Sequence, residues 1–377
     1  MNITVLLGGT SSERDVSLAS GARIAAALRR AGHRVSAVDP ATGVVELDAL
    51  EGRVKVAPPT AEELEALRAR GFTASLLELR EVREADVVFL ALHGGHGEDG
   101  TIQALLDLGG VRYTGSGHLA SALAMDKDLS KHLFRAAGVR TADWIMVTAE
   151  DDDRATRDRL PERVAAELGF PVVVKPSKQG STVGLSIVRQ PGELDAAVTE
   201  AFRHDDEVML ERFVPGRELT VGILGGEALP VGEIIPKKEI YDYECKYTPG
   251  MAVEEFPARI DDAVAAEVQE QARRAFRALK LRGCARIDFR LTPEGESWCL
   301  EANTLPGMTE TSLIPQAAAA AGMSFEVLCD RIAQLALETP AEAFPAAGAA
   351  AATTNGGRGV DAVSDGMNDA VNAVEER

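Results

Sequence analysis

Two carboxylates and an amide, those of Asp288, Glu301 and Asn303, occur in a stretch whose pattern predicts a two-stranded hairpin. Each strand alternates polar and apolar residues, and a Pro-Glu-Gly turn at 293–295 lets the strands pair antiparallel. The alternation places Arg286, Asp288, Arg290, Cys299, Glu301 and Asn303 on one face and Ile287, Phe289, Leu291, Trp298, Leu300 and Ala302 on the other. We therefore expect the two carboxylates and the amide to share one face.

Oxygen-only ligands suit a hard cation. Mg²⁺ in particular takes few protein carboxylates and completes its coordination with water and nucleotide phosphates. The hairpin is therefore predicted to bind Mg²⁺ (or Mn²⁺) together with ATP. A solvated strand face with ordinary ion pairs is the simpler interpretation of the same residues. The metal hypothesis is favoured by the Pro306-Gly307 turn that directly continues the second strand.

The elements before the hairpin predict an α/β architecture. The chain opens with a β-rich segment at 2–7, a Gly8-Gly9 turn and an amphipathic helix, and Ser12 and Asp15 have the spacing of a capping box. Later strands are expected at 34–38 and 86–92. This order predicts an N-terminal parallel sheet covered by helices.

Shorter elements follow residue 125. Helices are expected at 61–70, 128–137, 161–168, 262–279 and 325–338, and strands at 141–147, 172–175, 185–188 and 208–213. The segment PSKQGSTVG at 176–184 is polar and glycine-rich, so it is predicted to be a hairpin tip with spare backbone N–H groups. The tail at 341–377 has almost no large apolar residues and is predicted to be disordered.

Composition limits the function classes. A chain of 377 residues, 45% of them hydrophobic, is long enough for two or three domains. The net charge of −19 argues against nucleic acid or a membrane surface as partner. Four scattered cysteines without a CxxC pair predict reduced thiols. The start of the chain lacks the pattern of a signal peptide, and no apolar run approaches spanning length, so a cytoplasmic location is expected.

Five motifs in order along the chain resemble the ATP-grasp ligases, specifically the D-alanine–D-alanine ligase family. They are RID at 286–288 with EANTLPGMT at 301–309, GGTSSERDVS at 8–17, HGGHGEDG at 93–100, the segment 175–184, and YDYECKY at 241–247. A single glycine-rich match is weak evidence, whereas five ordered motifs are strong. Together they cover nearly all of residues 1–340.

The resemblance implies a three-domain α/β ATP-grasp fold whose N-terminal domain has a Rossmann-like parallel sheet. The implied parts are a substrate-binding domain at 1–125, a central ATP-grasp subdomain at 126–214 and a C-terminal ATP-grasp subdomain with the metal site at 215–340. ATP would be gripped between antiparallel sheets of the last two. A homodimer is expected from the same resemblance.

The implied reaction joins two D-alanine molecules. The carboxylate of the first attacks the γ-phosphate of ATP to give an acyl phosphate, and the amine of the second then displaces phosphate. By family position the ATP contacts are Lys127, Lys175, Gly180 with its loop, Glu211, Phe213, Val214, Glu218 and Lys246. Phe213 has core packing as a competing interpretation, because aromatics at strand spacing are usually buried in the core.

The resemblance also assigns residues to the two D-alanine sites. Glu13 would bind the first ammonium group, held near Ser181 by a bridge that includes Tyr247, although a carboxylate at a helix start is also ordinary capping chemistry. Arg286 and the Gly307 N–H would stabilise the oxyanion. The second carboxylate is assigned to Ser312 and Leu313, and His93 is placed near the substrates.

Four other functions are weighed against this one. A D-alanine–D-lactate ligase is disfavoured, because Lys246-Tyr247 follows the dipeptide-forming pattern of the family, whereas D-serine as second substrate stays open. A catalytically inactive ATP-binding module is disfavoured by the intact hairpin residues. A dehydrogenase is excluded because the turn at 8–12 is not GxGxxG.

Overall fold

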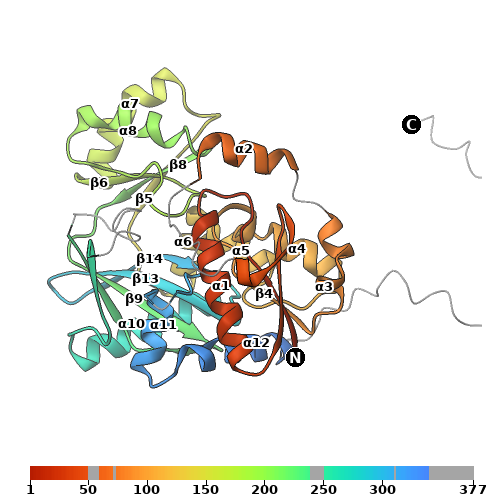
Figure 1. Cartoon of the computed structure of the whole chain (residues 1–377). Coiled ribbons are helices and arrows are strands. Elements are labelled where there is room, and N and C mark those ends of the chain that lie inside the picture. Colours follow the sequence, from red (N-terminus) through yellow and green to blue (C-terminus); the bar gives the residue numbers. More distant parts are fainter. Residues whose placement is uncertain (50–58, 71–73, 238–249, 310, 339–377) are drawn as a thin grey trace, which may run out of the picture. The chain divides into compact units, whose positions relative to one another are not determined.

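The computed structural model describes residues 1–49, 59–70, 74–237, 250–309 and 311–338. These ranges belong to one compact unit, and within them the strands form three sheets (Figure 1). The predicted tail at 341–377 lies outside the described residues. None of the helices in the described part of the chain combines the length and apolar character needed to cross a membrane.

The first sheet contains β1 (Asn2–Leu6), β2 (Arg34–Asp39), β3 (Gly43–Val45) and β4 (Val87–Leu90) in the order β3-β2-β1-β4. β1 pairs in parallel with β2 and β4, as the sequence predicts, and β3 adds an antiparallel edge. All four residues of β4 are apolar and buried, as is usual for a strand covered on both faces of a sheet. The carboxyl ends of β1 and β4 lead into the loops that approach the site.

Helix α1 (Arg14–Arg30) follows β1, but its predicted start is wrong. Glu13, not Ser12, is the N-cap residue, and it makes no side-chain cap hydrogen bond. At the start of the helix the acceptors come from Ser11, whose hydroxyl accepts from the Glu13 N–H at 3.1 Å and whose carbonyl accepts from the Arg14 N–H at 3.2 Å. The Glu13 carboxylate is thereby available for other contacts.

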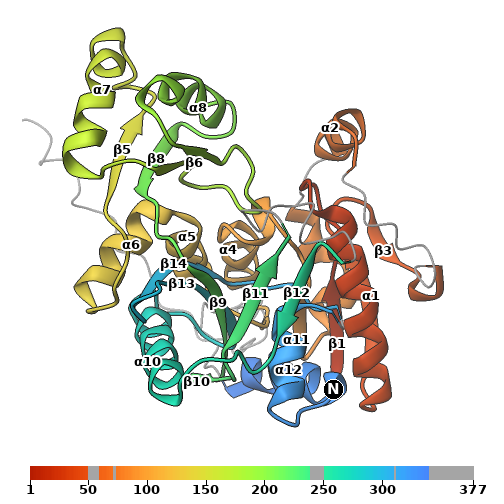
Figure 2. The ribbon, with the colours of Figure 1, turned by 90° about the vertical axis from the view of Figure 1, so that its left-hand side faces the viewer.

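The second sheet contains β5 (Trp144–Thr148), β6 (Val172–Pro176), β7 (Ser186–Val188) and β8 (Glu207–Arg212) in the order β5-β8-β6-β7, all antiparallel. Helices α7 (Arg154–Glu167) and α8 (Leu194–Ala201) pack on it (Figure 2). The prediction that α7 begins at Pro161 is wrong. It begins at Arg154 because Asp153 caps it, accepting from the Thr156 N–H at 2.7 Å.

The third sheet runs in the order β12-β11-β9-β13-β14, with β10 paired to β9. Its strands are β9 (Arg217–Leu224), β10 (Glu227–Ala228), β11 (Gly232–Pro236), β12 (Ala252–Glu255), β13 (Cys284–Leu291) and β14 (Ser297–Asn303). Apolar residues of α5 (His118–Met125), α6 (Lys127–Ala136) and α10 (Asp262–Ala278) share a core with β9, β13 and β14. The polar side chains of β13 therefore face away from that core.

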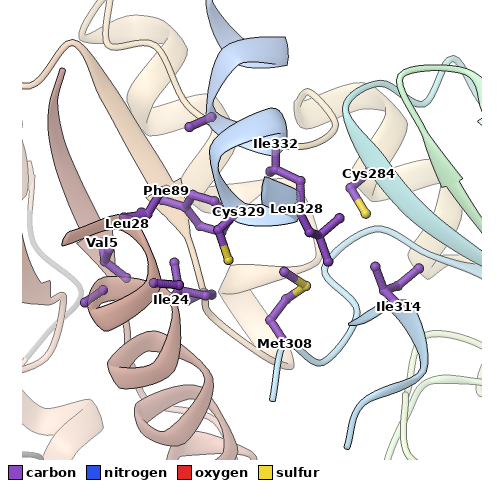
Figure 3. Packing of buried hydrophobic residues seen from close by; sticks show 14 of the residues in the cluster. Val5, Ile24, Leu28, Phe89, Cys284, Met308, Ile314, Leu328, Cys329 and Ile332 are labelled. Carbon is purple, nitrogen blue, oxygen red and sulfur yellow. The ribbon is translucent and has the colours of Figure 1, made fainter. Parts of the chain in front are cut away.

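A further core cluster anchors the loop that follows β14. Figure 3 shows Met308 of this loop together with Ile24 of α1 and Leu328 of α12 (Phe325–Glu338). Because Met308 is buried, its neighbour Gly307 is held in place beside the site. Helix α11 (Leu313–Ala320) contributes Ile314 to the same cluster.

The remaining elements are short or peripheral. They are the α-helices α2 (Ala61–Arg70), α3 (Arg80–Arg83) and α4 (Thr101–Leu108) and the 3-10 helices η1 (Leu47–Ala49), η2 (Ala74–Glu78), η3 (Gly95–Gly97) and η4 (Pro191–Glu193). The structure is thus a mixed α/β fold with one mainly parallel and two antiparallel sheets.

Candidate active site

The hairpin of β13 and β14 brings the predicted ligands together. Asp288 pairs directly with Glu301, and Arg286 pairs with Asn303. Residues paired across antiparallel strands project from the same face, so these four side chains lie side by side. All four also line one or both of the two cavities described below.

The alternation predicted for β14 is wrong at three residues, because Trp298 pairs with Arg290 and so lies on the polar face, and Cys299 and Leu300 also exchange faces. The register shifts between Asp288 and Phe289, so that Phe289 pairs with Cys299 and Leu300 is left as the extra residue of a β-bulge. Cys299 consequently faces the apolar core and is fully buried there, whereas Leu300 lines a cavity on the ligand side. The bulge keeps Glu301 on the ligand face.

The two carboxylates of the hairpin make hydrogen bonds and ion pairs with neighbouring polar side chains. Asp288 accepts from the Arg286 guanidinium, with Nε–Oδ1 at 2.9 Å and an Nη–Oδ2 distance of 2.8 Å, and from the Thr220 hydroxyl at 2.7 Å. Glu301 lies 3.3 Å from the Lys127 ammonium. The Oδ1 atom of Asn303 is buried without a hydrogen-bond partner, which is the state expected of an oxygen that awaits a cation or a ligand.

This trio does not form a cluster of three acidic, histidine or cysteine groups, and no such cluster occurs among the residues that the structure describes. Two carboxylates and one amide nevertheless fit a hard cation that keeps several ligand positions for water and phosphate. The donor chemistry and the partnerless Asn303 oxygen are therefore compatible with Mg²⁺.

A buried ionic cluster lies close by, on β6, β8 and α6. Both oxygens of Glu211 are engaged, one by Lys131 and the other by Lys175 at 2.5 Å. Burial opposes ionisation of Glu211, but the two lysines outweigh it and lower the pKa of the carboxyl to about 2. Burial lowers the pKa of Lys131 from its usual value. Lys131 was not predicted, although it follows Lys127 by one helical turn on α6.

A cavity of about 150 Å³ opens between the two antiparallel sheets. Its walls include Val173, Lys175 and Glu211 from the second sheet and Ile234 and Asp288 from the third. Phe213 and Val214 line it at the connection between the sheets, with Glu218 at the start of β9. Phe213 is absent from the buried core clusters of the described residues, so it lies at the cavity rather than in the core.

Arg290 was named from sequence only as a neighbour of the metal ligands, but it organises this cavity. Its Nε donates to the Val214 carbonyl at 3.2 Å, and one Nη lies 3.4 Å from Glu218. Its guanidinium also lies 5.9 Å from the Phe213 ring centroid. One arginine thus positions three residues that line the cavity.

A second cavity, of about 360 Å³, adjoins the first and is lined by side chains from the same face of the hairpin. Its walls include Glu13, His93, Asn303, Gly307, Ser312 and Leu313. Five residues line both cavities: Lys127, Gly180, Ser181, Arg286 and Glu301. The two cavities therefore meet at a wall that carries two cations, one carboxylate and the glycine-rich loop.

That loop contacts α1 directly. The Ser181 hydroxyl donates to Glu13 Oε1 at 2.6 Å, as the resemblance implies. Ser181 and Thr182 both have positive φ, 52° and 59°, which is unfavourable for residues with a Cβ and typical of functional loops. Gly94 approaches Glu13 from the other side, where a Cβ would lie 2.9 Å from Oε2. Glu13 is enclosed by backbone and loop at the cavity wall.

His93 connects the first sheet to the loop after β14. Because the Leu305 carbonyl can only accept, His93 Nδ1 donates to it at 3.0 Å, and Nε2 then accepts from the Ser20 hydroxyl at 3.1 Å. Ser20 in turn accepts from the Met308 N–H at 3.4 Å. His93 is buried and holds the segment around Gly307 in position.

The N-terminus of α11 faces the larger cavity through Ser312 and Leu313. The Ser312 hydroxyl accepts from the Thr309 N–H at 2.9 Å and contacts the Thr309 hydroxyl at 2.8 Å. A helix N-terminus carries partial positive charge and N–H donors, so this end suits a carboxylate.

Every site residue predicted from sequence within the described ranges lines one of the two cavities. Lys246 and Tyr247 lie outside the described residues. Sequence reasoning missed Arg23 and Glu98, which also line the larger cavity. Burial raises the pKa of the Glu98 carboxyl, with the nearby Glu13 acting in the same direction. Glu98 lies within a quoted motif, HGGHGEDG, which was a signal that could have found it.

Comparison with known proteins agrees with this geometry. The family described as D-ala D-ala ligase N-terminus matches residues 2–116, and D-ala D-ala ligase C-terminus matches residues 133–334. A D-alanine–D-alanine ligase of Syntrophotalea carbinolica is 42% identical over 331 residues, 88% of this chain and 94% of that protein.

Two solved structures extend the comparison. The D-alanine–D-alanine ligase of Bacillus anthracis complexed with ATP has a TM-score of 0.67 at 30% identity, covering 89% of this chain and 96% of that one. The VanG D-Ala:D-Ser ligase of Enterococcus faecalis has a TM-score of 0.72 at 30% identity, covering 89% and 98%. The chain therefore belongs to the D-alanine–D-alanine ligase family and has its ATP-grasp fold.

Proposed function

We propose that this protein joins two D-alanine molecules, at the expense of ATP, to D-alanyl-D-alanine for peptidoglycan precursor synthesis. The observation that carries the proposal is the wall shared by the two cavities. A phosphoryl group bound in the smaller cavity would reach a carboxylate bound in the larger one only across this wall. Lys127 and Arg286 stand there, where negative charge develops in such a transfer.

The smaller cavity suits the nucleotide. Its apolar walls and Phe213 suit the adenine ring, Glu211 can accept from the adenine amino group, and Glu218 can accept from ribose hydroxyls. Lys127 and Lys175 are placed to bind phosphate oxygens, and we assign Lys246 to the same role. The backbone N–H groups around Gly180 would add an anion-binding turn.

Asp288, Glu301 and Asn303 would hold Mg²⁺ or Mn²⁺. The partnerless Asn303 oxygen supports this assignment, and Asp288 would exchange part of its contact with Arg286 for the cation. When bound, the metal would neutralise charge on the phosphate oxygens. Arg286 lies 2.8 Å from Asp288, and Lys127 lies 3.3 Å from Glu301.

The larger cavity suits the amino acids. Glu13, oriented by Ser181, would bind the ammonium group of the first D-alanine, and Tyr247 is assigned to the same bridge. The carboxylate of this D-alanine attacks phosphorus, forming a C–O–P linkage as ADP leaves. The amine of the second D-alanine then attacks the carbonyl carbon, and phosphate departs with the C–O bond electrons.

Residues of this cavity can stabilise the second step. Arg286 and the Gly307 N–H would stabilise the oxyanion of the tetrahedral intermediate. Ser312 and the Leu313 N–H would hold the carboxylate of the second D-alanine, with the α11 N-terminus contributing positive potential. A cytoplasmic homodimer is the expected setting, carried by the family resemblance.

D-Serine as second substrate is the alternative with a specific observation behind it. The structural neighbour from Enterococcus faecalis is named a D-Ala:D-Ser ligase and matches over the same span. One added hydroxyl changes binding in a pocket by a small energy, so fold similarity does not separate the two substrates. A D-alanine–D-lactate ligase and an inactive ATP-binding module are less well supported.

Phosphate release and product mass test these assignments together. The purified chain should release phosphate from ATP only when D-alanine and Mg²⁺ are both present. Mass analysis of products from mixed D-alanine, D-serine and D-lactate should then show D-alanyl-D-alanine as the main product. Phosphate release that is indifferent to D-alanine would overturn the proposal, and a dominant mixed dipeptide would move the chain to the D-serine alternative.

A further inference from the structure

Lys131 is a fully buried lysine that pairs with Glu211, a residue lining the smaller cavity, and the proposed mechanism does not use it. It lies on α6 one turn after Lys127, but its ammonium points to Glu211 and to the Thr141 hydroxyl, at 2.7 Å from the latter. Its Nζ also lies 5.0 Å from the ring centroid of Trp144. A buried charged group is retained only when it is paired, so this position calls for a specific partner.

Glu211 is the partner of Lys131, and its ionisation depends on the lysines around it. Lys175 and Lys131 each take one oxygen of the carboxylate, so the cluster holds two cations and one anion. When Lys175 turns to the phosphates, as the proposed function requires, Glu211 would lose one counter-ion. A buried carboxylate with no cation beside it takes up a proton and no longer accepts from adenine through both oxygens.

Lys131 is also connected to the β13–β14 hairpin through Thr141. The Thr141 hydroxyl that accepts from Lys131 donates to the Cys299 carbonyl at 2.8 Å. Cys299 is the residue immediately before the bulged Leu300 and two positions before Glu301. The chain of contacts therefore runs from the adenine side of the cavity to the backbone of the strand that carries a predicted metal ligand.

We propose that Lys131 is a positioning residue for ATP, the permanent counter-ion that keeps Glu211 ionised and in place while Lys175 transfers to the phosphates. This inference rests on the proposed function for the transfer of Lys175. Lys131 itself contacts no substrate. It acts through Glu211 on nucleotide binding and leaves D-alanine binding alone, because none of its contacts reaches the larger cavity.

Steady-state kinetics of Lys131→Met test the proposal. Methionine keeps the unbranched shape and removes the charge. We expect the KM for ATP to rise at least tenfold, about 1.4 kcal/mol, with the KM for D-alanine within about twofold of wild type. Arg135→Met is the matched control, because Arg135 is on the same helix, also contacts Trp144 at 4.2 Å, and pairs with Asp143 at the surface. It should leave both constants unchanged.

A double variant separates positioning from general packing. If Lys131 acts through the charge of Glu211, Lys131→Met should add nothing to the effect of Glu211→Gln on the KM for ATP. Equal effects in both backgrounds, or a parallel rise in the KM for D-alanine, would overturn the proposal. If Lys131→Met alone does not fold, the double variant leaves no unpaired buried carboxylate and allows the same comparison with Glu211→Gln.

Calorimetric titration with ADP makes the result independent of the second substrate. Wild type should bind ADP, and Lys131→Met should bind it at least tenfold more weakly. Failure of wild type to bind ADP would count against the proposed function, whereas unchanged ADP affinity in Lys131→Met would overturn the role of Lys131 alone.

Discussion

The hydrogen bond between Ser181 and Glu13 links the glycine-rich loop to the substrate cavity, so its removal tests how the site is assembled. Ser181→Ala deletes the hydroxyl that donates to Glu13 Oε1 at 2.6 Å and keeps the backbone N–H groups of the loop. A hydrogen bond to a charged group contributes about 1.5–3 kcal/mol. If this orients Glu13 for the first D-alanine, kcat/KM for D-alanine should fall about 10- to 100-fold.

The assay is coupled detection of ADP with D-alanine varied at saturating ATP, then with ATP varied. The KM for ATP should change little, because the hydroxyl is the only group removed. Ser177→Ala is the control, since Ser177 is a buried serine at the base of the same loop and its hydroxyl lies 3.5 Å from Asp126, a weak contact. A kcat/KM for D-alanine within about twofold of wild type in Ser181→Ala would refute the role assigned to this hydrogen bond.

Three further predictions concern the hairpin, the buried cluster and the loop. Glu301→Gln should nearly abolish phosphate release at saturating Mg²⁺, and wild-type turnover would remove Glu301 from the proposed metal shell. Because the folded-state pKa of Glu211 is about 2, below its ordinary 4.5, this carboxylate stabilises the fold above pH 4.5, and the stabilisation is lost as pH falls toward 2. Glu211→Gln should therefore flatten the loss of Tm over this range, and a slope equal to that of wild type would contradict the pairing. Thr182→Gly should relieve the positive φ and raise the free energy of unfolding by about 1 kcal/mol while slowing turnover, and a lower stability would count against strain at this position.

Local patterns predicted the elements well. The helices expected at 61–70 and 325–338 have those bounds in the structure. The hairpin and the parallel core of the first sheet also agree with the prediction. Such elements depend on periodicity and turn residues within a short stretch, so the sequence contains the signal.

The wrong predictions concern features that depend on residues outside the stretch from which they were predicted. The bulge at Leu300 arises where β14 pairs with β13, and strict alternation cannot reveal an extra residue. The predicted start of α1 was wrong because the helix begins one residue later, with Glu13 as N-cap, and Ser11 accepts from the Glu13 and Arg14 N–H groups. The predicted start of α7 was wrong because the helix begins after its cap Asp153, and Pro161 lies inside it.

The residues of the candidate site differ in the same way in how far the sequence predicts them. Some predicted residues that line the cavities, such as Ser181 and Glu301, lie in contiguous motifs, whereas Glu211 was assigned by family position alone. Lys131 and Arg290 line or support the site through contacts with residues far away in sequence, such as Glu211 and Val214. A buried lysine looks like any surface lysine in a helix until its partner is placed beside it.

The polar groups that line the cavities depend on buried groups behind them. Groups that bind phosphate or carboxylate must carry uncompensated polarity toward the cavity, and such polarity is stable only if other buried groups hold it in place. Glu211 shows the arrangement, because its ionisation depends on lysines from two different elements, one of which the proposed reaction also needs. A site that lends Lys175 to its substrate must keep a second cation for the carboxylate left behind, and Lys131 is the cation that the described structure places there.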